Sequence, residues 1–164
     1  MNLLRFLSIT MIFILCFQIS FAGSRKPKDY TPDQLEKAAD TLMIHKVKLA
    51  IETYLWRDFM PQSPPDGKPL RAAITVAPVN QKFLPADIDA DKLWIIHGQE
   101  VWSATLKSVR QNMPSGNLTK LEKMAREGPK WGPGISVTVV IQIIDQKGDS
   151  HLLKAKDQLI HRTD

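Results

Sequence analysis

The sequence contains little cysteine: there is one, at position 16, among 164 residues. A single cysteine excludes an intrachain disulfide framework and every zinc site built from several cysteines. The sequence also lacks a G-x-S-x-G motif, a His-Glu-x-x-His motif and a glycine-rich phosphate loop. These absences favour a protein without catalysis, although an enzyme without a recognisable motif stays open.

Residues 1–22 have the pattern of an export signal. They carry one charge, Arg5, before an almost wholly apolar run from Phe6 to Ile19, and Ser20 and Ala22 occupy the positions that signal peptidase reads. The run of about 14 residues is shorter than the roughly 20 that span a bilayer. We therefore expect a cleaved signal peptide and a periplasmic or secreted protein, with a retained membrane anchor as the alternative.

Cleavage after Ala22 would change the composition of the working protein. It would remove 22 of the 164 residues and leave 142, and the loss of Arg5 would lower the net charge from +5 to +4. The loss of Cys16 would leave neither a thiol nor a disulfide, so packing alone would stabilise the core. A lipoprotein signal would need a small residue before the cysteine, where Leu15 stands.

The exported chain divides into a polar leader with a short helix, residues 23–44, and a β-rich domain, residues 45–164. Thr31 to Gln34 predicts the helix start, because threonine caps, proline suits the first turn and glutamine completes a capping box. Leu42 falls on the apolar face of this helix. From His45 to Trp56 apolar and polar residues alternate, which predicts a strand; a helix continued to residue 59 is the alternative.

Turn signals separate the other segments of the domain. Pro61–Pro69 holds four prolines and a glycine and is therefore expected to form a rigid loop. Leu118–Glu127 predicts a short amphipathic helix that Gly128 ends. The further predicted strands are Leu70–Val79, Leu93–His97, Val101–Leu106, Ile135–Asp145 and His151–His161, the last interrupted near Asp157.

Short strands, frequent turns and no βαβ alternation predict a mainly β protein, an antiparallel β-sandwich. The closing hairpin, Ile135–Asp145 with His151–His161, resembles the last two strands of immunoglobulin-like and fibronectin-like sandwiches. This resemblance of pattern spans about Lys46 to Arg162, and it implies an immunoglobulin-like fold with the helix of residues 118–127 in a crossover. The cysteine pair of antibody domains is absent, and the resemblance implies no activity.

Three aspartates alternate within residues 87–91, as they do at the start of a calcium loop. An EF-hand would next need a glycine and later a glutamate, where Lys92 and Gly98 stand. A solvated acidic loop is the alternative to a metal site. The candidate ligands of a metal-dependent module for calcium, zinc or copper are Asp87, Asp89, Asp91, His97 and Glu100.

Residues 54–61 combine three aromatic side chains, a charge pair and a methionine before the proline-rich loop. Tyrosine, tryptophan, methionine and arginine are enriched in interface cores. If a second loop with Trp131 lies at the same end, the rings predict a platform for a peptide or a sugar face. The alternative is that the rings close one end of the sandwich, with Arg57 and Asp58 tied to nearby backbone. The candidate binding residues are Tyr54, Trp56, Arg57, Asp58, Phe59 and Trp131.

Together these patterns favour an exported, non-catalytic binding or scaffold module of the bacterial periplasm or cell exterior, without a cofactor. Its partner would be a protein or a cell-envelope component, contacted through aromatic loops or an edge strand. Export and the scattered basic residues argue against nucleic acid as a partner, and no membrane span is expected after signal cleavage. A metal-binding secreted module or hydrolase is the alternative function.

Overall fold

The computed structural model describes residues 30–109 and 118–164. The expected signal peptide, Cys16 and the leader before Tyr30 lie outside the described residues. Within the two described ranges, no helix is long and apolar enough to cross a bilayer.

The first element of the described residues is the helix α1, Pro32–Glu36. Its predicted capping box is confirmed: the Gln34 N–H donates to the Thr31 hydroxyl (3.4 Å), and the Thr31 N–H donates to the Gln34 side chain (2.9 Å). The placement of Leu42 on this helix is wrong, because the helix ends at Glu36 and Leu42 begins strand β1, Leu42–Ile44.

Most of the described residues lie in strands, 57% against 4% in helix. The strand predicted from residue 45 is confirmed, and the alternative helix to residue 59 is wrong. The strands after β1 are β2 (Val47–Asp58), β3 (Leu70–Pro78), β4 (Asp89–His97), β5 (Glu100–Thr105), β6 (Lys107–Ser108), β7 (Leu121–Gly128), β8 (Ser136–Ile144) and β9 (Ser150–Thr163).

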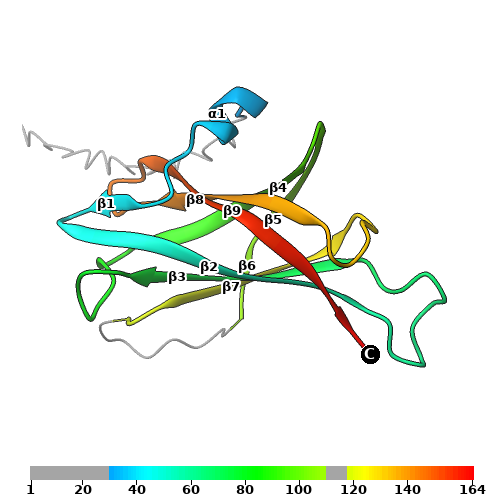
Figure 1. Cartoon of the computed structure of the whole chain (residues 1–164). Coiled ribbons are helices and arrows are strands. Elements are labelled where there is room, and N and C mark those ends of the chain that lie inside the picture. The colour runs from blue at the N-terminus through cyan, green and yellow to red at the C-terminus, as the bar shows by residue number, and fades with distance from the viewer. Residues whose placement is uncertain (1–29, 110–117) are drawn as a thin grey trace, which may run out of the picture.

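These strands form one nine-stranded sheet in the order β5-β4-β8-β9-β2-β3-β7-β6, with β1 paired to β2. The two ends of this order, β5 and β6, are separated in the sequence only by Leu106. The sheet therefore curls until it is nearly closed into a barrel, as Figure 1 shows from the side. This closure brings the first and last strands of the order together.

The mixed sheet means that the expected antiparallel, immunoglobulin-like sandwich is not confirmed. Residues Leu55–Asp58 of β2 run parallel to Ile160–Thr163 of β9, whereas the other strand pairs are antiparallel. Alternation in a sequence shows which residues face the core, but it does not show which strands pair or in which direction. The parallel pair joins segments about 100 residues apart, which no local pattern encodes.

The helix predicted at Leu118–Glu127 is wrong, because this segment forms strand β7. Its buried face consists of Leu121, Lys123 and Ala125, so a charged residue stands at an inward position and disguises the period of two. The ammonium of Lys123 is held by Asp89 at 2.5 Å and by the Ser108 hydroxyl at 3.1 Å. A buried lysine is tolerated where its charge is paired in this way.

The interruption predicted near Asp157 is confirmed as a bulge in β9. Val137 pairs with Gln158 but Val139 pairs with Ala155, so two β9 residues oppose one β8 residue. Asp157 adopts the left-handed conformation, with φ at 56°. Bulges of this kind twist a strand and redirect its side chains.

Two hydrophobic clusters hold the sheet. The main cluster fills the inside of the curled sheet, where Leu49, Leu93 and Ile141 are fully buried. A smaller cluster lies on the other side of β4 and β8, where Leu35 and Ala38 cover Trp94 and Val140. We call residues 32–38, which comprise α1 and the two residues after it, the α1 segment. The α1 segment thus shields part of the sheet's outer face, as Figure 1 shows.

Candidate functional site

The most distinctive feature of the described residues is the place where the sheet fails to close. β5 ends the strand order and has β4 on one side only, and β7 pairs with β6 only through Lys123 and Met124. We call the gap between β5 and residues 125–128 of β7 the seam. It leaves one edge of each of these two strands without a strand partner among the described residues.

The hydrogen-bond pattern shows which backbone groups face the seam. The Leu106 N–H donates to the Asp91 carbonyl of the β4 side at 2.8 Å. Backbone groups along an antiparallel strand alternate in direction, so those of Val101, Ser103 and Thr105 point away from β4. Further along the same edge the Val109 N–H donates to Glu122 of β7 at 3.3 Å. The edge that pairs with β7 at residues 107–109 therefore has no strand partner at residues 101–105 among the residues that the structure describes.

Two hollows lie along the seam. One of about 490 Å³ is bordered by the β4–β5 hairpin and by residues 127–131, and another of about 410 Å³ by residues 105–109 and 124–127. Glu127 borders both hollows and has a φ of 63°, a left-handed conformation that is uncommon for residues other than glycine. Trp102 lines the first hollow, and its ring lies 3.1 Å from the position that a Cβ on Gly128 would take.

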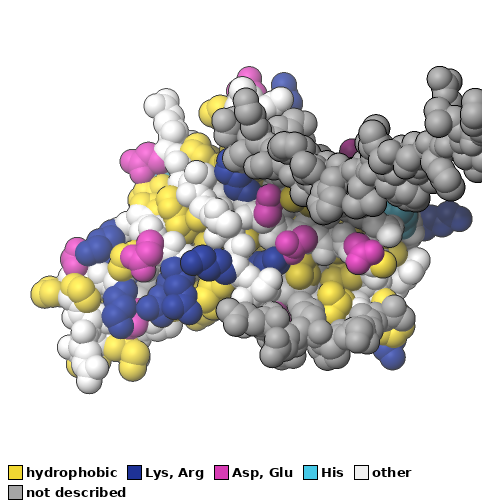
Figure 2. Space-filling view, turned by 180° about the vertical axis from the view of Figure 1, so that it is seen from behind, with side chains coloured by type: hydrophobic (Ala, Val, Ile, Leu, Met, Phe, Trp, Pro, Cys, Tyr) yellow, Lys and Arg dark blue, Asp and Glu magenta, His cyan; other side chains and the backbone are white. Residues whose placement is uncertain are grey.

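The side chains around the seam combine apolar residues with Glu100 and Glu127 at one end, and two cations with Glu127 at the other. Val101 is 41% exposed, and Trp131 lines the hollow beside it. Lys107 and Arg126 line the second hollow, and none of the ion pairs among the described residues includes either of them. Figure 2 shows a group of Lys and Arg side chains beside hydrophobic ones on one face of the molecule.

Arg57 is buried and binds backbone carbonyls of two loops. Its guanidinium donates to the carbonyls of Lys68 (3.0 Å), Asp66, Lys130 (3.0 Å) and Trp131 (3.2 Å). The arrangement agrees with the alternative that this residue is tied to backbone. It also fixes the loop of residues 129–134, and with it Trp131, at the end of the sheet.

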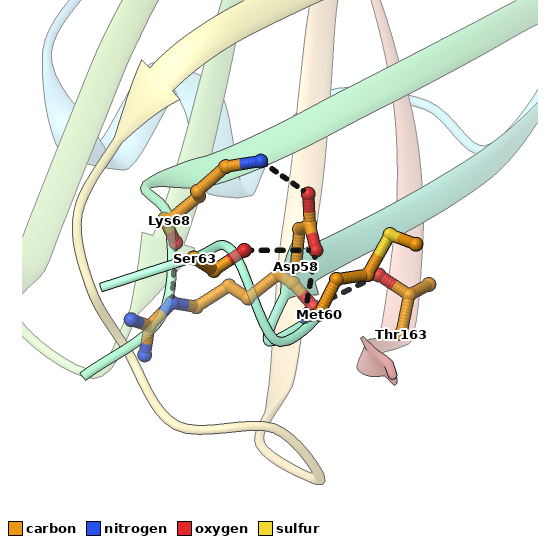
Figure 3. A network of polar contacts seen from close by, with 6 residues as sticks. Asp58, Met60, Ser63, Lys68 and Thr163 are labelled. Atoms are coloured by element: carbon orange, nitrogen blue, oxygen red, sulfur yellow. Dashed lines mark hydrogen bonds and ion pairs between the residues drawn. The ribbon is translucent and has the colours of Figure 1, made fainter. Parts of the chain in front are cut away.

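Asp58 forms a second buried network, shown in Figure 3. Its carboxylate accepts from the Lys68 ammonium at 2.9 Å, the Met60 N–H at 3.0 Å and the Ser63 hydroxyl at 3.1 Å. These donors stabilise the ionised form, Lys68 most of all, and they lower the pKa of Asp58 from 3.8 to about 2. The network orders the proline-rich loop that begins at residue 59.

The remaining candidate aromatic residues do not form one platform. Tyr54 stacks on Trp56 at 5.3 Å and on His161 at 5.1 Å between ring centroids, on the outer face of β2 and β9. Phe59 lies instead under the guanidinium groups of Arg57 and Arg162, at 4.9 and 4.2 Å. The candidates therefore divide between an outer stack, a buried arginine network and the seam.

Trp131 joins two groups of candidates that the sequence kept apart. Its indole N–H donates to the Glu100 carboxylate at 2.6 Å, and its ring lies 5.5 Å from that of His97. His97 and Glu100 were candidate metal ligands, and in the structure they hold Trp131 against the β4–β5 hairpin. Trp131 also packs on the main hydrophobic cluster.

The candidate metal ligands lie at opposite ends of β4. Eight residues separate Asp89 from His97, which is about 27 Å along a strand. Asp89 pairs with Lys123, and burial raises the pKa of Asp91. Asp87 lies before β4 with a φ of 55°. Within the described ranges, no three His, Cys, Asp or Glu side chains are placed to hold a metal ion.

Sequence reasoning did not single out Trp102, Lys107 or Arg126 as site residues. An edge strand was expected to be a contact surface, but its position depends on strand pairing. The signal available for locating this edge was the short interval between β5 and β6. One residue between two strands leaves no room for a separate turn, so the second strand continues the edge of the first. Comparison of the chain with family models, curated proteins and solved structures gave no significant match.

Proposed function

We propose that this chain is an exported, non-catalytic module that binds an extended segment of a partner protein along the free edge of β5. The observation that supports this proposal is the outward direction of the backbone groups of Val101, Ser103 and Thr105 beside two hollows. A peptide that adds a strand to a sheet edge forms main-chain hydrogen bonds there, and nearby pockets select its side chains.

The charges at the seam indicate the chemistry of the bound segment. Lys107 and Arg126 are exposed and form no ion pair among the described side chains. Against Glu127, the one carboxylate of that lining, they leave an excess of positive charge, which an acidic residue of the ligand would neutralise. Nearer the hairpin, Val101, Trp102 and Trp131 offer apolar contact. We therefore expect an extended segment in which apolar residues are followed by an acidic one.

Peptide selection tests the proposal directly, because a random library samples every extended segment that the edge could accept. Random twelve-residue peptides displayed on phage would be selected on the immobilised protein, and the affinity of synthetic copies measured by calorimetry. Ser103→Pro removes one outward N–H from the edge, and Ser103→Ala keeps it. We expect the proline variant to bind about twofold to tenfold more weakly, the effect of about one net hydrogen bond, and the alanine variant to bind normally.

The thermal midpoint of both variants provides the folding control, because an outward N–H makes no ladder bond with β4 and its loss should leave the fold intact. Failure to select any peptide would contradict the proposal. Equal binding by Ser103→Pro and the wild-type chain, with both folded, would show that the β5 edge is not the binding surface.

Export is the second part of the proposal, and the pattern of residues 1–22 supports it. Expression of the full chain in a bacterium, followed by intact mass measurement of the periplasmic fraction, tests it. We expect a chain that begins at Gly23. A full-length chain in the membrane fraction would instead support the retained anchor.

A further inference from the structure

A polar hollow lies on the opposite side of the sheet from the main hydrophobic cluster, beside the α1 segment. It has a volume of about 260 Å³. Ile96 of β4 and Thr138 of β8 are cross-strand partners. Lys154 of β9 pairs with Val140, which lies two residues after Thr138 on β8. The hollow is lined by Glu36, Ile96, Thr138, Lys154 and Lys156.

Lys154 is the notable residue of this hollow, because it is a cation that is only 6% exposed. Its ammonium donates to the Glu36 carbonyl at 2.5 Å, at the end of α1. None of the ion pairs among the described residues includes it. An ammonium has three donors, and a buried charge without a counterion is costly, so a bound anion would stabilise it.

The bulge in β9 places a second cation at the same hollow. Lys156 and Asp157 together oppose Thr138, and Lys156 is exposed and lines the hollow. The Thr138 side chain supplies a hydroxyl to the same lining. Bulges commonly redirect a side chain towards a site. Glu36 is the acidic residue of the lining, and its negatively charged carboxylate would repel a bound anion.

We propose that this hollow is an oxyanion site, in which Lys154, Lys156 and Thr138 bind a phosphate or carboxylate group of a small molecule. The two ammonium groups supply the charge, and the hydroxyl and the remaining Lys154 donors supply hydrogen bonds. Ile96 forms an apolar wall for the rest of the ligand. The site shares no lining residue with the seam hollows, so a test of anion binding here does not test the proposed function, and a failure of one does not affect the other.

Phosphate titration followed by NMR tests the site in the whole chain. Sodium phosphate would replace sodium chloride at constant ionic strength, and a parallel titration would use acetate. We expect saturable shifts of the Thr138, Lys154 and Lys156 amides, and the better of the two anions identifies the ligand group. Shifts that chloride alone reproduces, or that do not saturate with either anion, would overturn the proposal.

Variants assign the binding to these side chains. Lys154→Met should weaken phosphate binding more than tenfold, since it removes a hydrogen bond from a charged donor. Lys156→Gln should weaken it about twofold to fivefold, as expected for an exposed charge. Glu36→Gln should strengthen binding, because it removes the opposing carboxylate.

The matched control is Lys82→Gln, which removes an exposed lysine that lines neither this hollow nor the seam and should leave phosphate binding unchanged. If Lys154→Met does not fold, Lys156→Gln and Glu36→Gln decide the question, because both residues are exposed. Unchanged affinity in both of these variants would contradict the site. Equal weakening by Lys82→Gln would show general charge attraction and would contradict it as well.

Discussion

Arg57 joins two loops that lie far apart in the sequence. Its guanidinium donates to carbonyls at residues 66 and 68 and at residues 130 and 131. Because the side chain is only 4% exposed, the carbonyls that it serves would find few other donors if it were removed. The residue therefore positions Trp131, and through it one wall of the seam.

We expect Arg57→Met to lower the free energy of unfolding by at least about 3 kcal/mol, since several buried acceptors lose a charged donor. Urea unfolding followed by circular dichroism measures the change. Arg162→Met is the control: this arginine is 52% exposed in its side chain and pairs with Asp164, so its loss should cost under about 1 kcal/mol. Similar losses in the two variants would contradict the structural role of Arg57.

The free energy of unfolding depends on pH through the ionisation of Asp58. Its pKa is about 2 in the folded chain, mainly because Lys68 binds the ionised form, and near 3.8 when unfolded. The stabilisation is therefore complete above about pH 5 and is lost as the pH falls through 3.8 towards 2. We expect Asp58→Asn to lower the thermal midpoint at pH 7 and to lose less stability on acidification to pH 2 than the wild-type chain does.

The comparison with Asp66→Asn separates this effect from general acid denaturation. Lys130 also lowers the pKa of Asp66, but the Asp66 side chain is 65% exposed. Its removal should change the pH profile less than that of Asp58. A parallel pH profile for Asp58→Asn and the wild-type chain would refute the role of the Asp58 network.

At the scale of elements, β7 passes close to β5 and β3 at Gly128. A Cβ at this position would lie 2.9 Å from the Leu70 Cβ and 3.1 Å from the Trp102 ring. We expect Gly128→Ala to lower the free energy of unfolding by about 1–3 kcal/mol through overpacking. Denaturant unfolding measures it.

Gly132→Ala is the matched control, because the nearest atom to its added Cβ is an Ile135 carbon at 3.8 Å, an ordinary contact. This variant should stay within about 0.5 kcal/mol of the wild-type chain. If Gly128→Ala is equally harmless, then Trp102 does not pack across the seam as described.

The elements that sequence patterns predicted best are those with an uninterrupted period. β8 has an apolar residue at every second position, with Val137, Val139 and Ile141 buried, and was predicted to within about a residue. β7 was missed because its inward Lys123 breaks the alternation, and its charge is paired by Asp89, a residue more than 30 positions earlier. A pattern within ten residues cannot show that such a partner exists.

The whole molecule depends on pairings that local patterns do not encode. The parallel contact of β2 with β9 converts the expected sandwich into a sheet that is nearly closed. The same closure explains the candidate site: Trp131 and Glu100 were recognised as site residues, but their neighbours at the seam come from β5, β6 and β7. The aromatic, arginine and methionine content of residues 54–61 suggested an interface. The strand order was needed to show that the unpaired edge is that of β5.

Hydrogen exchange at the β5 edge tests the central proposal most directly. In the free protein we expect the amides of Val101, Ser103 and Thr105 to exchange quickly, while those of Trp102 and Ala104, which face β4, are protected. A selected peptide should then protect the first three amides on binding. Bound peptide that leaves these three amides unprotected would contradict strand addition and, with it, the proposed function.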